Sequence, residues 1–580
     1  LPRSVELLVV GGGPAGLGAA IEAARHGVET LVVDENERAG GQLYKQIHKF
    51  FGSAEHYAGT RGFRIAGELI AEVEALGVRI LPGFRAVGLL RDGRVVVEGP
   101  KRAYAVYAER VVLAAGGREN SLPFPGSTLP GIMSAGAAQT LCNVHRVLPG
   151  GRVAMVGSGN VGLIVAYQLM QAGAELAGLI ELRNKIGGYY VHAGKLRRAG
   201  VPFYLGHRVV KAEGEGRIES VTVESLSTGE HTHLSVDGLY LSVGLTPRQE
   251  LGRMFGCELS GESLLGGAFP LHDHRMRTSV ERVYVAGDAA GIEEANSSLD
   301  EGRLAGISVA EDLGKIRAGR AREESETIRA RLEELRSGSH GEGRLRAKER
   351  VASEAAARTG RIAGSFAAPR ESAPRVPVSG EPVPREAASR QPAAREQVSR
   401  VPVFRKPGPQ ESGSREPEGS NPPAIPCEKD ILEKAGKAGH ALPLIDCPET
   451  IPCNPCVDVC PAGAISMEGI CGLPEVDYEL CTGCMRCAAL CPGQAIFMVG
   501  LDPARDSGAA LVTVPWEYLP YPAQGESVEL YGRDGASLGL GTVTASRMPR
   551  TYDKTRLVTL AVPKEAAAEV QHCVVREGDR

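Results

Sequence analysis

Two segments of the chain repeat one pattern: an apolar strand runs into Gly-x-Gly-x-x-Gly, then a helix, then a second apolar strand that ends in an acid. The first segment is VELLVVGGGPAGLGAAIEAARHGVETLVVDE, with Gly11, Gly13 and Gly16. Such glycines permit a tight turn and let the backbone approach a pyrophosphate, which the N-terminus of the following helix binds. Asp34 ends the second strand, where an acid hydrogen-bonds a ribose. This segment therefore predicts a dinucleotide-binding βαβ unit.

The second segment is RVAMVGSGNVGLIVAYQLMQAGAELAGLIE. Its candidate binding residues are Gly157, Gly159, Asn160, Gly162 and Glu181. An acid at the end of the second strand favours NAD(H) over NADP(H), because it accepts a hydrogen bond from a free 2′-hydroxyl. Arg183 lies close by and keeps NADP(H) open, and a unit that has lost its ligand and survives as scaffold is a further alternative.

Three further motifs extend the pattern: AGGQ at residues 39–42, VVLAAGGRENSLPFPG at 111–126 and RTSVERVYVAGDAAG at 277–291. With the two glycine units, they resemble the two-dinucleotide-domain flavoproteins, the group that includes glutathione reductase. The resemblance implies a discontinuous FAD domain, residues 1–128 and 247–315, with an NAD(P)-binding-like domain inserted at 129–246. It also implies that the residues around FAD are Gly11, Gly13, Pro14, Ala15, Gly16, Asp34, Glu35, Gly41, Gln42, Ala115, Gly116, Gly287 and Asp288.

Many members of that group relay electrons through a redox-active cysteine pair, and this chain lacks one in the corresponding region. No cysteine precedes Cys142, and neither Cys142 nor Cys257 has a neighbouring partner. We therefore expect both to be buried apolar residues, and we expect the flavin to exchange electrons with another acceptor.

Nine of the 13 cysteines lie between Cys447 and Cys491, in two runs that repeat each other. CTGCMRCAALCP has the C-x2-C-x2-C-x3-C-P spacing of a bacterial iron–sulfur site. CNPCVDVCP carries only the last three of these cysteines, and the offset of 31 residues places the missing one at Thr450. Zinc ribbons use separated C-x2-C pairs, so the spacing favours two [4Fe-4S] clusters over zinc or disulfides.

The last cysteine of each run binds the other cluster in two-cluster ferredoxins. One predicted cluster therefore has the ligands Cys460, Cys481, Cys484 and Cys487. The other has the ligands Cys453, Cys456 and Cys491 and one open position. Cys447 is the favoured fourth ligand, since it needs only a lengthened loop, whereas Cys471 would have to fold back from the opposite side. A three-iron cluster is the alternative if neither serves.

The remaining segments differ in composition. Twelve prolines mixed with Arg, Glu, Ser and Ala lie between Pro369 and Pro423, and this composition cannot bury enough apolar surface to fold. Short alternating runs broken by glycine and proline follow the cysteines, which indicates a small β-barrel or sandwich. We expect a charged helix at 316–337, a disordered linker at 338–424, a ferredoxin domain at 425–499 and a small β domain at 500–580. The predicted fold class is thus α/β with two Rossmann-like domains, then the linker, an α+β dicluster ferredoxin domain and a small all-β domain.

Bulk properties narrow the class of function. A net charge of −4 argues against nucleic-acid binding, and no segment reads as a secretory signal or a membrane span. We therefore expect a cytoplasmic protein, where clustered cysteines bind metal more often than they form disulfides. Hydride donors give up two electrons and clusters accept one at a time, so a flavin belongs between them.

The segment GGQLYKQIHKFFGSAEHYAGTRGF, taken with the cysteine module and the β tail, resembles the FAD-containing α subunits of heteromeric amino-acid dehydrogenases of the sarcosine oxidase, proline or hydroxyproline dehydrogenase and hydrogen cyanide synthase type. The resemblance implies an FAD-dependent electron-transfer subunit beside a second, amine-oxidising flavoprotein subunit, with a ferredoxin or another carrier as acceptor. No catalytic residue is legible, because that chemistry would lie on the other chain. The alternatives are a self-sufficient NAD(P)H:ferredoxin-type oxidoreductase, similar to the glutamate synthase small subunit, and a non-enzymatic redox sensor or docking protein.

Overall fold

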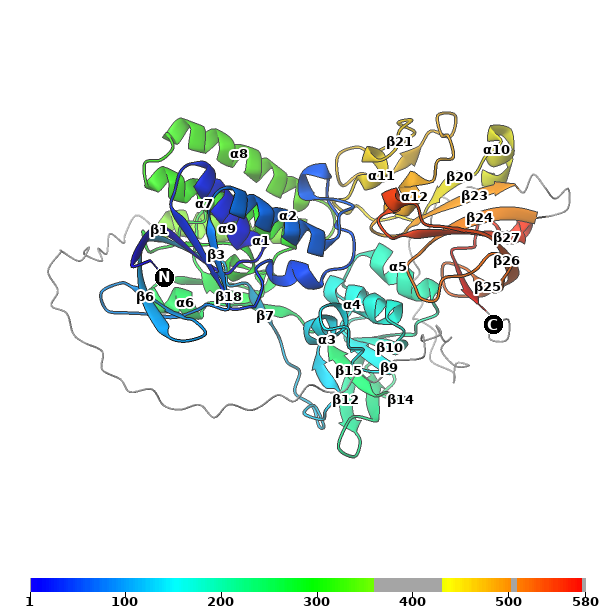
Figure 1. Ribbon diagram of the computed structural model, residues 1–580. Helices are drawn as coiled ribbons and strands as arrows, with labels where there is room; N and C mark the ends of the chain where they lie inside the picture. The colour runs from blue at the N-terminus through cyan, green and yellow to red at the C-terminus, as the bar shows by residue number, and fades with distance from the viewer. Residues whose placement is uncertain (1, 359–429, 502–508, 576–580) are drawn as a thin grey trace.

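Three large β-sheets organise the part of the chain that the structure describes (Figure 1). The computed structural model describes residues 2–358, 430–501 and 509–575. Two of the sheets contain parallel strands with helices packed against them, and the third is antiparallel. This arrangement confirms the predicted fold class of two Rossmann-like units followed by a separate ferredoxin region.

The first sheet has the strand order β3-β2-β1-β6-β5-β4, with β19 beside β6. Its strands are β1 (Ser4–Val10), β2 (Thr30–Asp34), β3 (Arg79–Pro82), β4 (Arg85–Leu89), β5 (Val95–Glu98), β6 (Ala103–Leu113) and β19 (Val283–Val285). Strands β1, β2, β3, β6 and β19 are parallel, whereas β4 and β5 pair antiparallel on the way to β6. Because β19 follows β6 only after the whole second sheet, the first sheet is built from two separate stretches of chain.

Helices α1 (Pro14–Arg25) and α7 (Ala295–Asp312) pack against each other beside this sheet. A Cβ atom on Gly302 would lie 1.9 Å from the carbonyl oxygen of Ala15, so only glycine allows this close approach. The helices that surround them are α2 (Gly62–Ala75), α8 (Ala318–Leu335) and α9 (Glu342–Arg358). Short elements complete the region: α6 (Glu250–Met254), β17 (Leu259–Glu262), β18 (Gly267–Pro270), η1 (Gly41–Lys45), η2 (Ala54–His56), η3 (Ser263–Leu265) and η4 (Gly287–Ala290).

The second sheet has the strand order β11-β10-β9-β15-β8. Its elements are β8 (Ile132–Ser134), α3 (Ala135–Asn143), β9 (Arg152–Val156), α4 (Asn160–Gln171), β10 (Glu175–Glu181), α5 (Tyr190–Arg198), β11 (Phe203–Leu205) and β15 (Gly238–Leu241). An antiparallel sheet of β12 (His207–Glu213), β13 (Ser220–Ser225) and β14 (His231–Ser235) lies next to it in sequence. The chain passes between the first two units through the antiparallel pair β7 (Gly117–Glu119) and β16 (Leu245–Pro247).

The third sheet has the strand order β20-β23-β24-β27-β26-β25-β28. Its strands are β20 (Leu442–Ile445), β23 (Ile496–Leu501), β24 (Ala509–Trp516), β25 (Ser527–Tyr531), β26 (Ser537–Arg547), β27 (Arg556–Pro563) and β28 (His572–Val575). The cysteine-bearing segments add α10 (Ile431–Ala438), α11 (Pro455–Asp458), β21 (Ile465–Ser466), β22 (Glu475–Val476) and α12 (Arg486–Leu490), and two short turns are η6 (Arg550–Tyr552) and η7 (Lys564–Ala566).

The expected boundary at residue 500 is corrected by this third sheet. Strand β23 belongs to the predicted ferredoxin domain and β24 to the predicted C-terminal domain, yet they pair in register from Met498–Thr513 to Leu501–Ala510. The physical reason is that β23 is apolar and buried, so its edge is covered by a further strand instead of being left open. The cysteine segments and the C-terminal strands therefore form one packed unit.

The expected start of the linker at residue 338 is also corrected, because α9 is a helix. Its buried residues Ala347, Val351 and Ala355 recur every four positions and pack against Leu265 and Phe269 of the first unit. Alanine contributes little to an apolar pattern, so this stripe does not stand out in the sequence. The rest of the expected linker, from residue 359 to 424, lies outside the described residues.

Buried ion pairs attach α8 and α9 to α7. The carboxylate of Glu301 is fully buried and accepts hydrogen bonds from Arg336, at 2.5 Å, and from Lys348, at 2.6 Å. Arg336 also donates to Glu293, at 2.9 Å. These contacts make residues up to 358 part of the first unit.

Replacing Arg336 by Met should destabilise the protein by about 3–5 kcal/mol, because it leaves Glu293 and Glu301 buried with one cation fewer. Urea unfolding followed by circular dichroism measures this change in the free energy of unfolding. The matched control is Arg346→Met, which removes an exposed pair with Glu342 and should cost less than about 0.5 kcal/mol. Equal effects of the two substitutions would show that the buried network does not hold α9.

Candidate functional site

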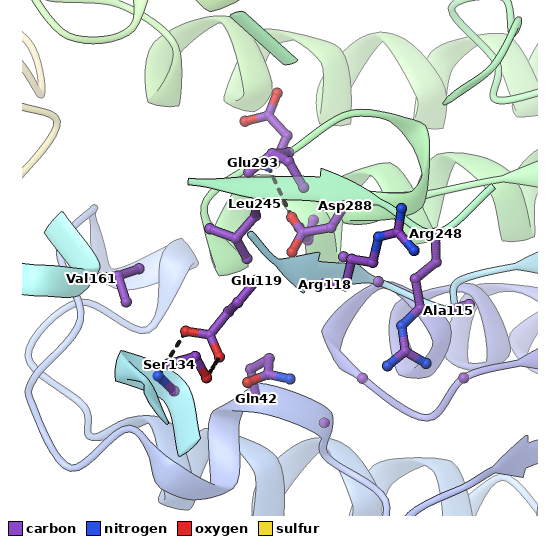
Figure 2. Close-up of a pocket in the computed structure, with 18 of the residues that line it drawn as sticks. Gln42, Ala115, Arg118, Glu119, Ser134, Val161, Leu245, Arg248, Asp288 and Glu293 are labelled. Carbon is purple, nitrogen blue, oxygen red and sulfur yellow. Dashed lines mark hydrogen bonds between the residues drawn. The ribbon is translucent and has the colours of Figure 1, made fainter. Parts of the chain in front are cut away.

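A cavity of about 1450 Å3 is lined by residues of the first two units (Figure 2). Gly11 and Gly13 of the first glycine turn line it, and so do Gly159 and Asn160 of the second turn. Of the residues predicted to surround FAD, those that line the cavity are Gly11, Gly13, Pro14, Ala15, Asp34, Glu35, Gly41, Gln42, Ala115, Gly116 and Asp288. Gly16 and Gly287 do not line it, and neither do Gly157, Gly162 and Glu181 of the second turn.

The first glycine turn leaves an open cradle at one position only. Gly11 has φ +104°, and a Cβ atom there would lie 2.2 Å from the carbonyl oxygen of Ala114. At Gly16 a Cβ atom would lie 1.8 Å from the carbonyl oxygen of Gly11. At Gly13 the nearest atom is the Cα of Gly41, at 3.9 Å. Gly11 and Gly16 thus shape the turn, and Gly13 presents bare backbone to the cavity, as a pyrophosphate requires.

The acid at the end of β2 braces this turn. Asp34 accepts a hydrogen bond from the backbone N–H of Gly12 at 2.6 Å and from the backbone N–H of Asn36 at 2.8 Å. The next residue, Glu35, also lines the cavity and pairs with Arg248 at 2.7 Å. Both carboxylates are therefore at the cavity, and contact with a ribose stays a prediction for each.

The second glycine turn has the same internal bracing. Gly157 has φ +100°, and Glu181 accepts a hydrogen bond from the backbone N–H of Ser158 at 2.9 Å. The loop before α5 lies over the turn: Gly188 donates its N–H to the carbonyl of Ser158 at 2.8 Å, and Tyr189 donates to the side chain of Asn160 at 2.8 Å. Binding of NAD(H) at this turn stays a prediction.

The structure brings Cys447 together with Cys453, Cys456 and Cys491. Burial raises the pKa of Cys447, and the neighbouring thiols of Cys491 and Cys456 raise it further. Burial also raises the pKa of Cys453, followed by Cys491, Cys447 and Cys456. The four thiols therefore lie near one another, and Cys447, Cys453 and Cys491 pack against one buried apolar cluster. Their role as the ligands of the first cluster stays a prediction.

The other four predicted ligands form a second group. Burial raises the pKa of Cys481, and Cys460 and Cys484 add to it. Burial raises the pKa of Cys487 to about 12, with Cys484 and Cys456 as contributing neighbours. The influence of Cys456 on Cys487 shows that the two groups are adjacent.

Two backbone N–H groups point at sulfur in equivalent places of the repeat. Ala464 donates to Cys460 Sγ at 3.3 Å, and Ala495 donates to Cys491 Sγ at 3.5 Å. Such donors stabilise thiolate ligands of iron–sulfur clusters. Within residues 430–501 and the other described ranges, no three His, Cys, Asp or Glu side chains could share one metal ion. A four-iron cluster does not need this, since each of its irons takes one thiolate.

Cys471 is not among the thiols that act on Cys447, Cys453 or Cys456, although its neighbour Ile470 accepts a hydrogen bond from the N–H of Cys453 at 2.9 Å. The sulfur of Cys471 is 3.1 Å from the hydroxyl of Ser337, between α8 and α9. Thr450, at the vacant position of the first run, accepts a hydrogen bond from the backbone N–H of Ser339 in the same loop. The loop between α8 and α9 therefore contacts Thr450, the position at which the repeat would place a fourth ligand. The same loop also contacts Cys471, the alternative fourth ligand.

Comparison with protein families decides the identity of the first two units. The family model described as pyridine nucleotide-disulphide oxidoreductase matches residues 5–302, more than half of the chain. The chain belongs to this family. The 4Fe-4S dicluster domain matches residues 451–501. That range begins after Cys447, so it supports iron–sulfur clusters without testing this ligand.

Relatives of this pyridine nucleotide-disulphide oxidoreductase include components of several oxidases. An opine oxidase subunit from Agrobacterium tumefaciens is 33% identical over 53% of this chain and 66% of its own length. The hydrogen cyanide synthase subunit HcnB of Pseudomonas aeruginosa is 31% identical over 57% of this chain and 76% of its own. The alpha subunit of sarcosine oxidase from Rhizobium meliloti is 27% identical over 53% of this chain and 31% of its own. The predicted resemblance to subunits of the sarcosine oxidase and hydrogen cyanide synthase type is thereby confirmed.

Among solved structures, L-proline dehydrogenase from P. horikoshii matches at a TM-score of 0.44 and 22% identity, over 56% of this chain and 59% of that one. No helix in the described segments has the length and apolar character needed to cross a membrane.

The family implies FAD, and the cavity fits it. The bare backbone at Gly13 provides a cradle that any side chain would fill. Asp288 also lines the cavity and accepts a hydrogen bond from the backbone N–H of Glu293 at 2.9 Å (Figure 2). Burial raises the pKa of Asp288 to about 7, and its acidic neighbours Glu293 and Glu294 raise it further. A carboxyl in this position is suited to hydrogen-bond a ligand hydroxyl.

This family member departs from the disulphide chemistry in the family's description. Up to residue 358 its only cysteines are Cys142 and Cys257. Both are buried, and burial raises the pKa of each. Neither is poised as a reactive thiolate, so a dithiol relay is not available in this part of the chain.

Several cavity residues lie outside every motif that the sequence offers. His340 enters the cavity wall from the loop between α8 and α9, and Arg344 enters it from the first turn of α9. Both fall within the expected linker. Arg344 lies 3.6 Å from the carboxylate of Glu293. Tyr189 comes from the loop before α5 and stacks edge-on against His340, with ring centroids 4.9 Å apart. His340 and Arg344 reach the cavity because α9 packs against the first unit.

Tyr189 also connects the cavity with the first cysteine group. It belongs to a buried apolar cluster against which Cys447, Cys453 and Cys491 pack. Phe51 packs on Tyr189 at 5.6 Å between ring centroids, and the next residue, Gly52, accepts a hydrogen bond from the N–H of Asn454 at 3.0 Å. The first cysteine group thus lies directly behind one wall of the cavity, whereas Cys484 of the second group is exposed.

Proposed function

We propose that this chain is the FAD- and iron–sulfur-dependent electron-transfer subunit of an amino-acid or amine dehydrogenase complex. Its partner would be a second, amine-oxidising flavoprotein subunit. The observation that carries the proposal is the shared packing of Tyr189, a wall residue of the cavity, with Cys447, Cys453 and Cys491. The family likeness to subunits of opine and sarcosine oxidases supports the substrate class.

The proposed electron route has an order. A bound flavin supplies the conversion between two-electron and one-electron chemistry. The first cysteine group lies next to the cavity, and the second lies beyond it with Cys484 at the surface. Electrons would therefore pass from the cavity through the first cluster to the second, and from there to a ferredoxin or another carrier. The residues of this chain hold the cofactors in place and leave amine oxidation to the partner.

One observation favours a second candidate, a self-sufficient NAD(P)H:ferredoxin-type oxidoreductase. Gly159 and Asn160 of the second glycine turn line the same cavity as the first turn. A nicotinamide cofactor bound at the second turn would then share a space with the flavin.

Anaerobic rapid mixing separates the two candidates. In the proposed role, the flavin is bleached rapidly when the co-purified partner is supplied with its amine. NADH or NADPH alone should bleach it at least about tenfold more slowly, because the partner and not this chain binds the substrate that donates the electrons. The amine panel includes sarcosine, proline and an opine. Rapid bleaching by NADH without a partner would overturn the first candidate and support the second.

A further inference from the structure

Three buried basic side chains surround the Cys491 segment. Lys49 Nζ donates to the carbonyl of Ala489 at 2.5 Å. Lys195 Nζ donates to the carbonyl of Pro492 at 2.9 Å, and Arg198 donates to the carbonyl of Gln494 at 3.1 Å. Lys49 comes from the first unit, and the other two come from α5 of the second unit. Side chains of the first two units thus place three basic groups around the segment that contains Cys491.

The remaining charged groups of this interface do not cancel these cations. Burial acts to raise the pKa of Glu517, but Arg61 and Lys49 hold it at about 2, so it is ionised. Asp553 pairs with Arg61 at 3.2 Å and Arg64 at 2.8 Å. His48 and His192 are neutral, because burial lowers the pKa of His48 to about 3 and that of His192 well below its usual range. These two acids are thus shared with two further arginines. On the side of Cys447, Asp446 and Glu449 add negative charge, and Asp446 pairs with Arg533 at 2.9 Å. The basic groups still outnumber the acids.

Both lysines are buried, and Lys195 keeps its charge at neutral pH. Lys195 is 4% exposed, and burial lowers its pKa to about 8. Burial also lowers the pKa of Lys49, which is 3% exposed and donates to Thr555 at 2.7 Å as well. Away from water, the field of each ammonium group is screened only weakly.

The internal repeat provides a comparison within the same molecule. The residues that correspond to Ala489, Pro492 and Gln494 in the first run are Asp458, Pro461 and Gly463. All three of these are exposed to solvent. The cations therefore surround one member of the repeat, the Cys491 segment, while the Cys460 segment faces water.

We propose that Lys49, Lys195 and Arg198 raise the reduction potential of the cluster held by Cys447, Cys453, Cys456 and Cys491 above the value it would have without them. This inference rests on the proposed function, because it requires the two clusters. The potential of an iron–sulfur cluster depends on the charge around it, and a nearby positive charge stabilises the reduced, more negative form. These three are positioning residues: they act through the Cys491 segment and make the cluster next to the cavity a better electron acceptor.

The test is an EPR-monitored potentiometric titration of the anaerobically purified full chain, with redox dyes and without a partner. Lys195→Met keeps the length of the side chain and removes its charge. It should lower the ratio of reduced to oxidised first cluster about tenfold at a fixed potential, which is about 59 mV for a one-electron couple. The second cluster should not change, and the Cys447→Ser variant identifies which signal belongs to the first.

Two controls separate charge from packing. Lys195→Arg keeps the charge and should retain the wild-type potential. Arg486→Gln removes an exposed charge next to Cys487 and should change the second cluster less than about twofold, because solvent screens it. If Lys195→Met loses iron, Lys49→Met takes its place, and the same shift is expected.

An unchanged potential in an iron-replete Lys→Met variant would overturn the inference, and so would an equal shift in Lys195→Arg. Failure of the proposed function looks different, because it shows in the unmodified chain: NADH alone would rapidly bleach its flavin, or the chain would lack flavin or clusters.

Discussion

Replacing Cys447 by serine is expected to remove or convert one of the two iron–sulfur clusters and to leave the other intact. Iron–sulfur clusters are bound by thiolate ligands, and a serine hydroxyl is a much poorer ligand than a thiolate. Iron content should fall from about eight per chain to between about four and seven, depending on whether the cluster is lost or becomes a three-iron species. Iron analysis and EPR of the oxidised protein measure this result.

The structural reason is the position of Cys447 relative to the vacant ligand site. The repeat would place a ligand at Thr450, but that residue bonds to Ser339 in the loop between α8 and α9. Cys447 instead faces Cys456 and Cys491, and its pKa is raised first by burial and then by these two thiols. It is thus the cysteine that the fold offers to the open position.

The matched control is Cys471→Ser, which changes the cysteine engaged by Ser337. This variant should keep both clusters and the full iron content. Two intact four-iron clusters in Cys447→Ser, together with a lost cluster in Cys471→Ser, would reverse the assignment of the ligand.

Replacing Gly13 by valine is expected to abolish or strongly weaken FAD binding while the protein still folds. A Cβ atom at Gly13 meets no protein atom closer than the Cα of Gly41 at 3.9 Å, so the turn tolerates it. The branched side chain would instead fill the cradle that a pyrophosphate must approach. Overfilling a packed site typically costs about 1–3 kcal/mol, which corresponds to roughly 10- to 100-fold weaker binding. Flavin content after purification and fluorescence titration with FAD measure the effect.

Gly159→Val is the matched control in the second turn, where a Cβ atom also meets nothing within 4 Å. It should leave the flavin content unchanged. A loss of flavin in both variants would mean that the first turn has no special role. A loss of NADH-driven flavin reduction in Gly159→Val alone would support the NAD(P)H-dependent candidate.

The parts of the site that could be predicted from the sequence depend on short spacings. Gly16 is needed because a Cβ atom would strike the carbonyl oxygen of Gly11 within the same βαβ unit, and this contact is local. The clash at Gly11 is with the distant Ala114, but its place in the glycine pattern makes Gly11 predictable as well. The two groups of cysteines follow from a repeat whose members lie within about one helical turn of each other along the chain. Cys447 could be favoured on the same grounds, since it precedes the open position by a short loop.

The parts that could not be predicted depend on contacts between distant segments. Arg344 reaches the cavity because α9 returns to α7 through the buried pairs of Glu301. Lys195 reaches Pro492 across almost 300 positions of sequence. Neither residue belongs to a motif, and α9 has an alanine stripe that resembles a charged linker in composition. The expected boundary at residue 500 is wrong for a similar reason. The pairing of β23 with β24 depends on how the two strands meet in space and cannot be read from the sequence of either strand.

The number of electrons that one flavin and two clusters on a single chain accept can be measured. The experiment is an anaerobic reductive titration of the full chain, followed by absorbance and EPR. We expect an uptake of about four electrons per chain, two at the flavin and one at each cluster. Uptake of about two electrons with bleaching of the flavin alone, or no uptake at all, would refute the proposed electron-transfer role.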